Sequence, residues 1–114
     1  MMDCIFCKII KKEIPSQIVF EDDEILAFKD INPMAPVHIL LIPKKHISDI
    51  TEISSDDAEL IGRIHVTAVK IAKDLGIDQD GFRLVNNCKK HGGQEVFHLH
   101  FHLIGGRKLG AFAG

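Results

Sequence analysis

The sequence predicts an α+β fold, in which a five-stranded antiparallel sheet is combined with one long helix and a short N-terminal helix. Segments whose apolar residues recur with a period of two fill much of the chain, and such segments are typical of β-strands. One segment, over residues 55–75, has instead the period of an amphipathic helix. Because the strands do not alternate regularly with helices, we expect an antiparallel sheet covered on one face.

Length and composition limit what the protein can be. A chain of 114 residues suits one core, so we expect residues 1–114 to form a single domain. The hydrophobic fraction of 46% suits a globular protein in water, and a net charge of -2 disfavours nucleic acid as a partner. We find no apolar run of about 18 residues and no secretory leader, so we expect no membrane partner. Three cysteines, an odd number, favour a reducing compartment, and we predict a cytoplasmic protein.

Five segments are expected to form the strands. Each is bounded by turn-forming residues. They are residues 17–21, 25–31, 37–42, 82–87 and 95–104. The segment 37–42 is almost wholly apolar, so we place it at the centre of the sheet. Residues 32–36 and 88–93 are predicted loops, and the tail 108–114 is only weakly specified.

Two helices are predicted. The long one extends from residue 55 or 56 to Leu75, where Gly76 provides a stop signal. Asp56 and Glu59 have the spacing of a capping arrangement at its start. Its apolar stripe consists of Leu60, Ile61, Ile64, Ala68, Ile71, Ala72 and Leu75. The short helix is expected over residues 8–13.

Three histidines occupy alternate positions in the last predicted strand: His98, His100 and His102. In a strand their side chains would share one face. At a rise of about 3.3 Å per residue, the first and third lie roughly 13 Å apart along the backbone, too far for one ion to bind both. The three rings are therefore expected to have different functions. A half-exposed strand is the alternative, but three of the seven histidines within five residues make it a poor explanation.

A Cys-x-x-Cys motif near the start of the chain is formed by Cys4 and Cys7. Three interpretations apply: a redox pair, two unrelated cysteines, or half of a tetrahedral zinc site. Only three residues precede Cys4, which leaves no room for the strand before a redox motif. We favour the zinc site, which requires two further ligands from elsewhere in the chain.

The histidine row also suggests a nucleophile. An imidazole whose one nitrogen donates to a backbone carbonyl presents its other nitrogen as a nucleophile near neutral pH. His100 lies in the middle of the row, and we expect phosphorus as its target. Gly92, Gly93 and Gln94 precede the strand and could offer backbone N–H groups to phosphate oxygens. Asn87, at the end of the neighbouring strand, could add a side-chain donor.

These features resemble the histidine triad (HIT) superfamily. The sequence His98-Leu-His100-Phe-His102-Leu-Ile104 matches its HxHxHxx pattern, in which x is apolar. Gly-Gly-Gln before the pattern and Gly-Gly-Arg after it are similar to the Hint branch, the nucleoside phosphoramidases. The resemblance covers nearly the whole chain. Its further matches are residues 4–10, 13–16, 26–28, 30–31, 35–38, 42–47 and Asn87.

The resemblance implies a catalytic set of His100, His102 and His38. His100 would attack the α-phosphorus of a nucleoside monophosphate group and hold it as a covalent nucleotidyl-histidine until water releases it. His102 would contact the phosphate near the leaving group, and His38 would support the cluster.

The resemblance also implies a nucleotide-binding cleft. Asp30 would bind the ribose hydroxyls, and phosphate would meet Asn87, Gly93, Gln94 and Glu95 beside the two catalytic histidines. The apolar residues expected around a purine base are Phe6, Ile14, Phe28, Ile31 and Leu40, for which core packing is the alternative. Animal members usually carry serine where this chain has Glu95. A carboxylate there would repel phosphate or favour an aminoacyl leaving group.

A structural zinc ion, one per chain, is implied by the zinc-containing members of the superfamily. In them, the two cysteines are joined by the histidine after Pro-x-x and by the first histidine of the triad. These four ligands correspond to Cys4, Cys7, His46 and His98. His98 would then serve the metal, while the other two members of the row serve the phosphate.

The implied function is cleavage of the P–N bond of purine nucleoside phosphoramidates or aminoacyl-adenylates, with release of AMP. The alternatives are a dinucleoside polyphosphate hydrolase of the same superfamily and a zinc-stabilised nucleotide-binding protein with little turnover. The resemblance further implies a homodimer, in which the long helix and the fourth strand pair across a two-fold axis to form a ten-stranded sheet. The partner's tail, 108–114, would lie near the leaving group.

Overall fold

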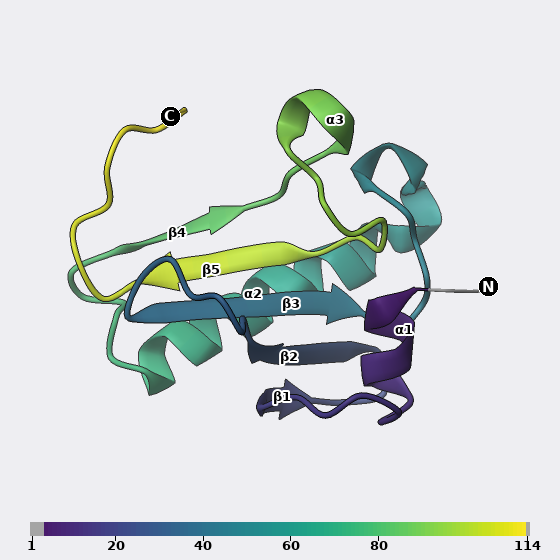
Figure 1. Cartoon of the computed structure of the whole chain (residues 1–114), viewed down its shortest axis with the longest axis horizontal. Helices are drawn as coiled ribbons and strands as arrows, with labels where there is room; N and C mark the ends of the chain where they lie inside the picture. Colours follow the sequence, from purple (N-terminus) through teal and green to yellow (C-terminus); the bar gives the residue numbers. More distant parts are fainter. Residues whose placement is uncertain (1–3, 114) are drawn as a thin grey trace.

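The computed structural model describes residues 4–113, and in it a five-stranded sheet carries a long helix on one face and a short helix on the other (Figure 1). The strands are β1 (Ile18–Glu21), β2 (Ile25–Lys29), β3 (Val37–Pro43), β4 (Phe82–Val85) and β5 (Phe101–Gly105). The helices are α1 (Ile5–Ile10), α2 (Ala58–Asp74) and α3 (Lys89–Gly92), with 3-10 turns at Ile50–Glu52 and Ser55–Asp57. The predicted α+β class is confirmed.

Neighbouring strands are antiparallel throughout the sheet, in the order β1-β2-β3-β5-β4. β3 lies at the centre, as its apolar sequence predicted, and Leu41 pairs with Ala27 of β2 on one side and Phe101 of β5 on the other. β1 and β4 form the two edges of the sheet.

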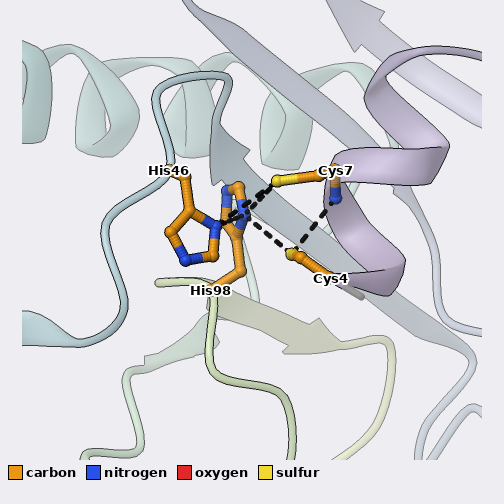
Figure 2. Close-up of side chains that lie close together, drawn as sticks. All are labelled: Cys4, Cys7, His46 and His98. Atoms are coloured by element: carbon orange, nitrogen blue, oxygen red, sulfur yellow. Dashed lines mark hydrogen bonds between the residues drawn. The ribbon is translucent and has the colours of Figure 1, made fainter. Parts of the chain in front are cut away.

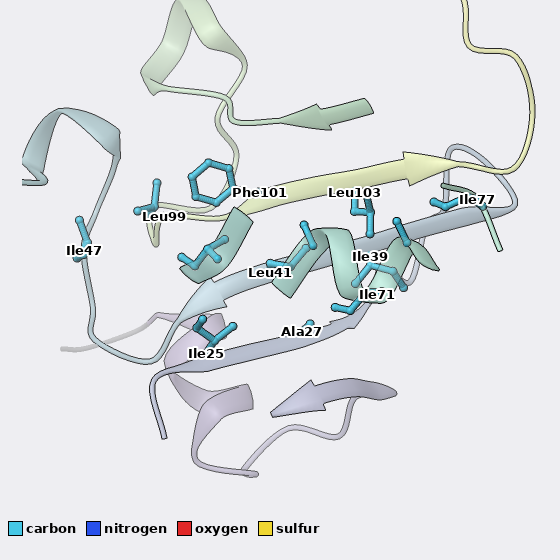
Figure 3. Packing of buried hydrophobic residues seen from close by; sticks show 13 residues of the cluster. Ile25, Ala27, Ile39, Leu41, Ile47, Ile71, Ile77, Leu99, Phe101 and Leu103 are labelled. Carbon is cyan, nitrogen blue, oxygen red and sulfur yellow. The ribbon is translucent and has the colours of Figure 1, made fainter. Parts of the chain in front are cut away.

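The period of two in the strands separates two cores. Alternate residues such as Ala27, Leu41 and Leu103 face α2 and form the larger cluster (Figure 3). The residues between them, such as Leu40 and Ile42, face the other side and pack under α1. Full burial of such an aliphatic side chain contributes roughly 1.5 to 3 kcal/mol. α1 covers only part of the second face (Figure 1), and on this face His102 pairs with Leu40 across β3 and β5.

The ends of α2 follow local signals, one of which was misread. Ser54 begins the preceding 3-10 turn: its hydroxyl accepts from the N–H of Asp56 (3.2 Å), and the Asp57 carboxylate accepts from the N–H of Ser54 (3.0 Å). The predicted capping pair, Asp56 with Glu59, is therefore wrong, because the capping box lies two residues earlier. Gly76 follows the helix with a φ of 73°, as a helix stop requires. Among residues 4–113, every helix falls short of the length and apolar character needed to cross a membrane.

The histidine stretch differs from its predicted form. β5 begins only at Phe101, so residues 95–100 are not part of the ladder. Backbone groups of this stretch bond to loops instead: Leu99 N–H donates to the Ile47 carbonyl at 2.6 Å, and Val96 C=O accepts from the Gln94 amide at 3.0 Å. β2 and β4 are also two residues shorter than expected, α3 replaces part of the predicted 88–93 loop, and α1 starts three residues earlier than predicted.

Candidate functional site

The histidines form a continuous row of rings on the α1 face of the sheet. Ring centres lie 4.8 Å apart for His46 and His98, 5.1 Å for His100 and His102, and 5.2 Å for His102 and His38. Phe6 of α1 links the two halves, because its ring packs edge-on against both His98 and His100. The three rings of the triad therefore have different neighbours, which is compatible with the different functions expected of them.

His98 is fully buried, with an exposed fraction of 0%. Its Nε2 lies 2.8 Å from the carbonyl oxygen of Pro43, which can only accept, so Nε2 carries the proton. Nδ1 is then a bare lone pair, and it lies 3.3 Å from Cys4 Sγ and 3.6 Å from Cys7 Sγ. Burial lowers the pKa of this imidazole from 6.5 to about 4, which keeps it neutral at physiological pH.

Cys4, Cys7, His46 and His98 converge at one point, as the sequence predicted (Figure 2). Their ligand atoms all lie within 4.8 Å of one another. His46 Nδ1 lies 3.1 Å from His98 Nδ1 and 3.3 Å from Cys7 Sγ. A tetrahedron with metal bonds of roughly 2.3 Å to sulfur and 2.0 Å to nitrogen has edges of about 3.3 to 3.8 Å. The donor set therefore fits one tetrahedral ion.

Electrostatics also favour a cation between these ligands. Burial and the neighbouring Cys4 raise the pKa of the Cys7 thiol, so a thiolate at this position needs a compensating positive charge. Local structure holds the Cys4 sulfur in place, since Cys4 is the N-cap of α1 and its Sγ accepts the N–H of Cys7 at 3.2 Å.

His100 presents one bare ring nitrogen. Its Nδ1–H donates to the carbonyl of His98 at 2.8 Å, which leaves a lone pair on Nε2. The side chain is 6% exposed, and burial lowers its pKa, so the ring is neutral near pH 7. The amide of Asn86 donates to the His100 carbonyl at 3.0 Å and fixes the backbone just before β5.

His102 has the opposite tautomer. The N–H of Met34 donates to His38 Nδ1 at 3.1 Å, so His38 carries its proton on Nε2. That nitrogen lies 2.9 Å from His102 Nδ1 and 3.5 Å from Asp30 Oδ2. His102 Nδ1 must then accept, which places its proton on Nε2. The site thus holds two neighbouring neutral rings. Nε2 carries a lone pair in His100 and a proton in His102.

The predicted base-contacting residues do not all come together. Phe6, Phe28 and Leu40 are buried in the α1-side cluster, and the first two rings meet edge-on at 5.6 Å. Ile14 packs against this cluster. Ile31 does not, because its exposed fraction is 91%. Asp30 lies at the border of the cluster and solvent, and its side chain is 20% exposed beside His38.

The glycine turn before the histidines differs from its predicted role. The N–H groups of Gly92, Gly93 and Gln94 donate within the turn, to the carbonyls of Cys88, Lys90 and Lys89. The prediction that all three are free to bind phosphate is therefore wrong, since α3 uses them. The Asn87 amide, also predicted to bind phosphate, donates to the Gly92 carbonyl at 2.7 Å and retains a second N–H.

Two contributors to the site were missed in the sequence. Asn86 supports His100, and the Met34 backbone sets the tautomer of His38. Gln94 has a structural part as well: it is 7% exposed, accepts the N–H of Lys89 and donates to the carbonyl of Ser48. An Asn at a strand end was a signal for Asn86, and a Gln after two glycines was a signal for Gln94, which the sequence had already singled out. No residue type could signal the Met34 contact, because the backbone makes it.

A cavity of about 750 Å³ bordered by the start of β4 and the 106–109 segment contains none of the histidines.

The chain thus combines a five-stranded antiparallel sheet with a row of histidines that leads into β5, the fourth strand in the sheet order. These are features of the histidine triad proteins. The family model described as HIT domain matches residues 11–109, and the chain belongs to this family.

Individual relatives agree over nearly the full length. A purine nucleoside phosphoramidase of Escherichia coli K12 is 51% identical over 108 residues, which cover 95% of this chain and 91% of that protein. A histidine triad protein from Clostridium difficile has a TM-score of 0.94 at 54% identity, covering 98% of this chain and 97% of that one. A HIT family hydrolase from Legionella pneumophila Philadelphia 1 has a TM-score of 0.96 at 51% identity, covering 98% and 100%.

Burial of His102 predicts a loss of stability in mild acid. Burial, followed by the neighbouring His100 and His38, lowers its pKa from 6.5 to about 4. Below pH 6.5, His102 therefore binds a proton in the unfolded chain but stays neutral in the folded chain. The contribution of His102 to the free energy of unfolding is complete above pH 6.5 and is lost as the pH falls towards 4.

Urea unfolding from pH 7 to pH 4 measures this effect. The slope of unfolding free energy against pH should be smaller in His102→Gln than in the wild-type protein. His91→Gln, which removes an exposed histidine of α3, is the control. Equal slopes in the wild-type protein and His102→Gln would contradict the prediction.

Proposed function

We propose that the protein is a purine nucleoside phosphoramidase, which cleaves the P–N bond of nucleoside phosphoramidates or aminoacyl-adenylates and releases AMP. The observation that carries the proposal is the pair of complementary tautomers in His100 and His102, whose ring centres lie 5.1 Å apart. One ring can attack phosphorus while the other donates a hydrogen bond to the departing nitrogen. The relative of that name, at 51% identity, supports the same chemistry.

The first step forms a phosphorus–nitrogen bond to the enzyme. The lone pair of His100 Nε2 attacks the phosphorus, and the bond from phosphorus to the substrate nitrogen breaks. The electron pair of that bond goes to the departing amine, which accepts a hydrogen bond from His102 Nε2–H and takes a proton from solvent. The nucleotide is then held on a cationic His100. The positive charge of this ring is stabilised by the hydrogen bond that its Nδ1–H donates to the carbonyl of His98.

The second step restores the enzyme. Water attacks the same phosphorus, gives up a proton to solvent, and displaces His100 with its electron pair. The products are AMP and a neutral His100. His38 and Asp30 keep His102 in the tautomer that the first step needs, through the 2.9 Å contact between the two imidazoles.

The substrate would lie on the open part of the α1 face. We assign the base to the apolar surface of Phe6, Phe28, Leu40 and Ile14, with Ile31 folding over it from the exposed 30–36 loop. Asp30 would accept from the ribose hydroxyls, and Asn87, Gly93, Gln94 and Glu95 would border the phosphate and leaving group. Glu95 is exposed and its carboxylate is close enough to favour positive charge on His100. It would therefore suit a leaving group that carries an amine.

Release of AMP from adenosine 5′-phosphoramidate tests the proposal. The wild-type protein should turn over this substrate faster than a dinucleoside polyphosphate, and His100→Ala should lower kcat by about 1,000-fold or more because the covalent route is lost. AMP affinity, measured by calorimetry, should stay within about threefold in the variant. His91→Ala removes a histidine outside the row and should keep full activity.

Three outcomes separate the candidates. Faster cleavage of the polyphosphate would favour the second hydrolase class of the superfamily. Tight AMP binding without turnover of either compound would favour a nucleotide-binding protein. Near-normal turnover by His100→Ala would remove the assignment of the nucleophile.

We propose that the cluster of Cys4, Cys7, His46 and His98 holds one structural zinc ion. Two thiols and two imidazoles are the ligand types of such sites, and their spacing suits a tetrahedron. The ion would supply the positive charge that holds both sulfurs as thiolates and would tie α1 to the sheet. Cysteines that are free of disulfides also support a reducing, cytoplasmic location.

Freshly purified protein should contain one zinc ion per chain by elemental analysis. Chelation should lower the melting temperature by at least about 5 °C, because the folded state alone assembles the four ligands. Cys7→Ser should lose the metal. Cys88→Ser is the matched control, since that cysteine lies outside the cluster, and it should retain it. Metal-free protein with an unchanged melting temperature on chelation would refute the site.

We also propose that the protein is a homodimer joined along β4 and α2 into a ten-stranded sheet. β4 is an edge strand, and Phe82 at its start is 37% exposed. Val66 and Val69 of α2 are 70% and 43% exposed, so α2 presents apolar side chains to solvent and β4 leaves one edge of the sheet open. One self-complementary patch of this kind is enough for a two-fold interface.

Light scattering at micromolar concentration should report twice the 12.7 kDa mass of one chain. Val66→Glu should shift the protein towards monomer, because the charge would be buried against its copy. Met34→Glu changes an equally exposed apolar residue elsewhere and should leave the dimer intact. A wild-type monomer would refute the assembly.

The tail of the partner chain is proposed to lie near the leaving group. Removal of residues 108–114 should therefore alter the preference among leaving groups, and an unaltered preference would refute the function given to the tail.

A further inference from the structure

Phe6 connects the metal-ligand cluster to the nucleophile. It lies between Cys4 and Cys7 in α1, and it is 6% exposed. Its ring stands nearly perpendicular to that of His100, at 89° and with 5.1 Å between centres, and it also meets His98 at 6.0 Å. A ring held at this angle limits rotation of the imidazole that it touches. The helix that carries two of the cluster ligands therefore also carries the side chain that restrains His100.

His98 provides a second connection. Its ring belongs to the cluster through Nδ1, while its backbone carbonyl accepts the Nδ1–H of His100 at 2.8 Å. This hydrogen bond is what leaves the lone pair of His100 on Nε2. Movement of His98 would thus change the tautomer and the direction of the nucleophile at once.

We infer that the Cys4–Cys7–His46–His98 cluster positions the nucleophile as well as stabilising the fold, with Phe6 and the His98 carbonyl as its two points of contact with His100. The inference rests on the proposed phosphoramidase function. α1 has six residues, and an isolated helix shorter than about 12 to 15 residues is marginal in water. Its place on the sheet then depends on the cysteines at its start and on its buried side chains Phe6 and Ile9.

Nitrogen NMR of the imidazoles tests the coupling without reference to turnover. With the metal bound, His100 should give the separate ¹⁵N signals of a fixed Nδ1–H tautomer. After chelation, at a temperature where circular dichroism still reports folded protein, these signals should move towards the average of both tautomers. Kinetics of the same samples should show kcat reduced by about 10- to 100-fold, with KM within about threefold.

A pair of substitutions in α1 separates positioning from anchoring. Phe6→Leu should keep the metal and lower kcat, because the restraining ring is lost while the cluster remains. If Phe6 served only the base, KM would rise instead. With the metal bound, Ile9→Ala should lower the melting temperature while leaving kcat and the His100 signals unchanged, because the cluster ligands Cys4 and Cys7 still hold the start of α1, and with it Phe6, in place.

Unchanged His100 signals and kcat after chelation, with only the melting temperature lowered, would overturn the inference. A wild-type protein that fails to cleave phosphoramidates would instead contradict the proposed function. In that case the NMR comparison alone still decides whether the cluster holds His100.

Discussion

The placement of His98 is the constraint on which the rest of the site depends. Its ring is fully buried, one nitrogen donates to the Pro43 carbonyl, the other faces the cysteines, and its own carbonyl accepts from His100. A buried polar group that loses its partner costs about 1 to 3 kcal/mol, so these contacts support one another. They bring together the loop after β3, the helix α1 and the approach to β5, and they leave the next two histidines with defined tautomers.

Most of this arrangement could be predicted from local patterns. The period of two through His98, His100 and His102 indicated a shared face and different functions for the three rings, and the Cys-x-x-Cys motif indicated half of a metal site that needs two more ligands. The start of β5 could not be predicted, because Leu99 bonds to Ile47 rather than to a strand, and such a partner is not recorded in local sequence. The same applies to Gly92–Gln94, whose N–H groups are used by a four-residue helix that has no apolar period.

The two faces of the sheet divide the molecule's tasks. Residues such as Leu41 and Leu103 face α2 and supply apolar burial, whereas His38 and His102 emerge between them on the other face. On that second face, burial serves chemistry, because it keeps imidazoles neutral: the pKa of His102 is lowered to about 4. The alternation of side chains along β3 and β5 therefore allows His38 and His102 to lie on two inner strands of the sheet without replacing any residue of the larger core.

The separation of the four cluster residues along the chain also sets an order in which the site can form. Cys4, Cys7 and His46 are synthesised well before His98. Until the segment with His98 and β5 has been made, a metal could meet only three of the four side chains, and the central strand β3 lacks its neighbour β5. The complete cluster, the closed sheet and the histidine row therefore all require that segment, so a product truncated before it would possess none of the three.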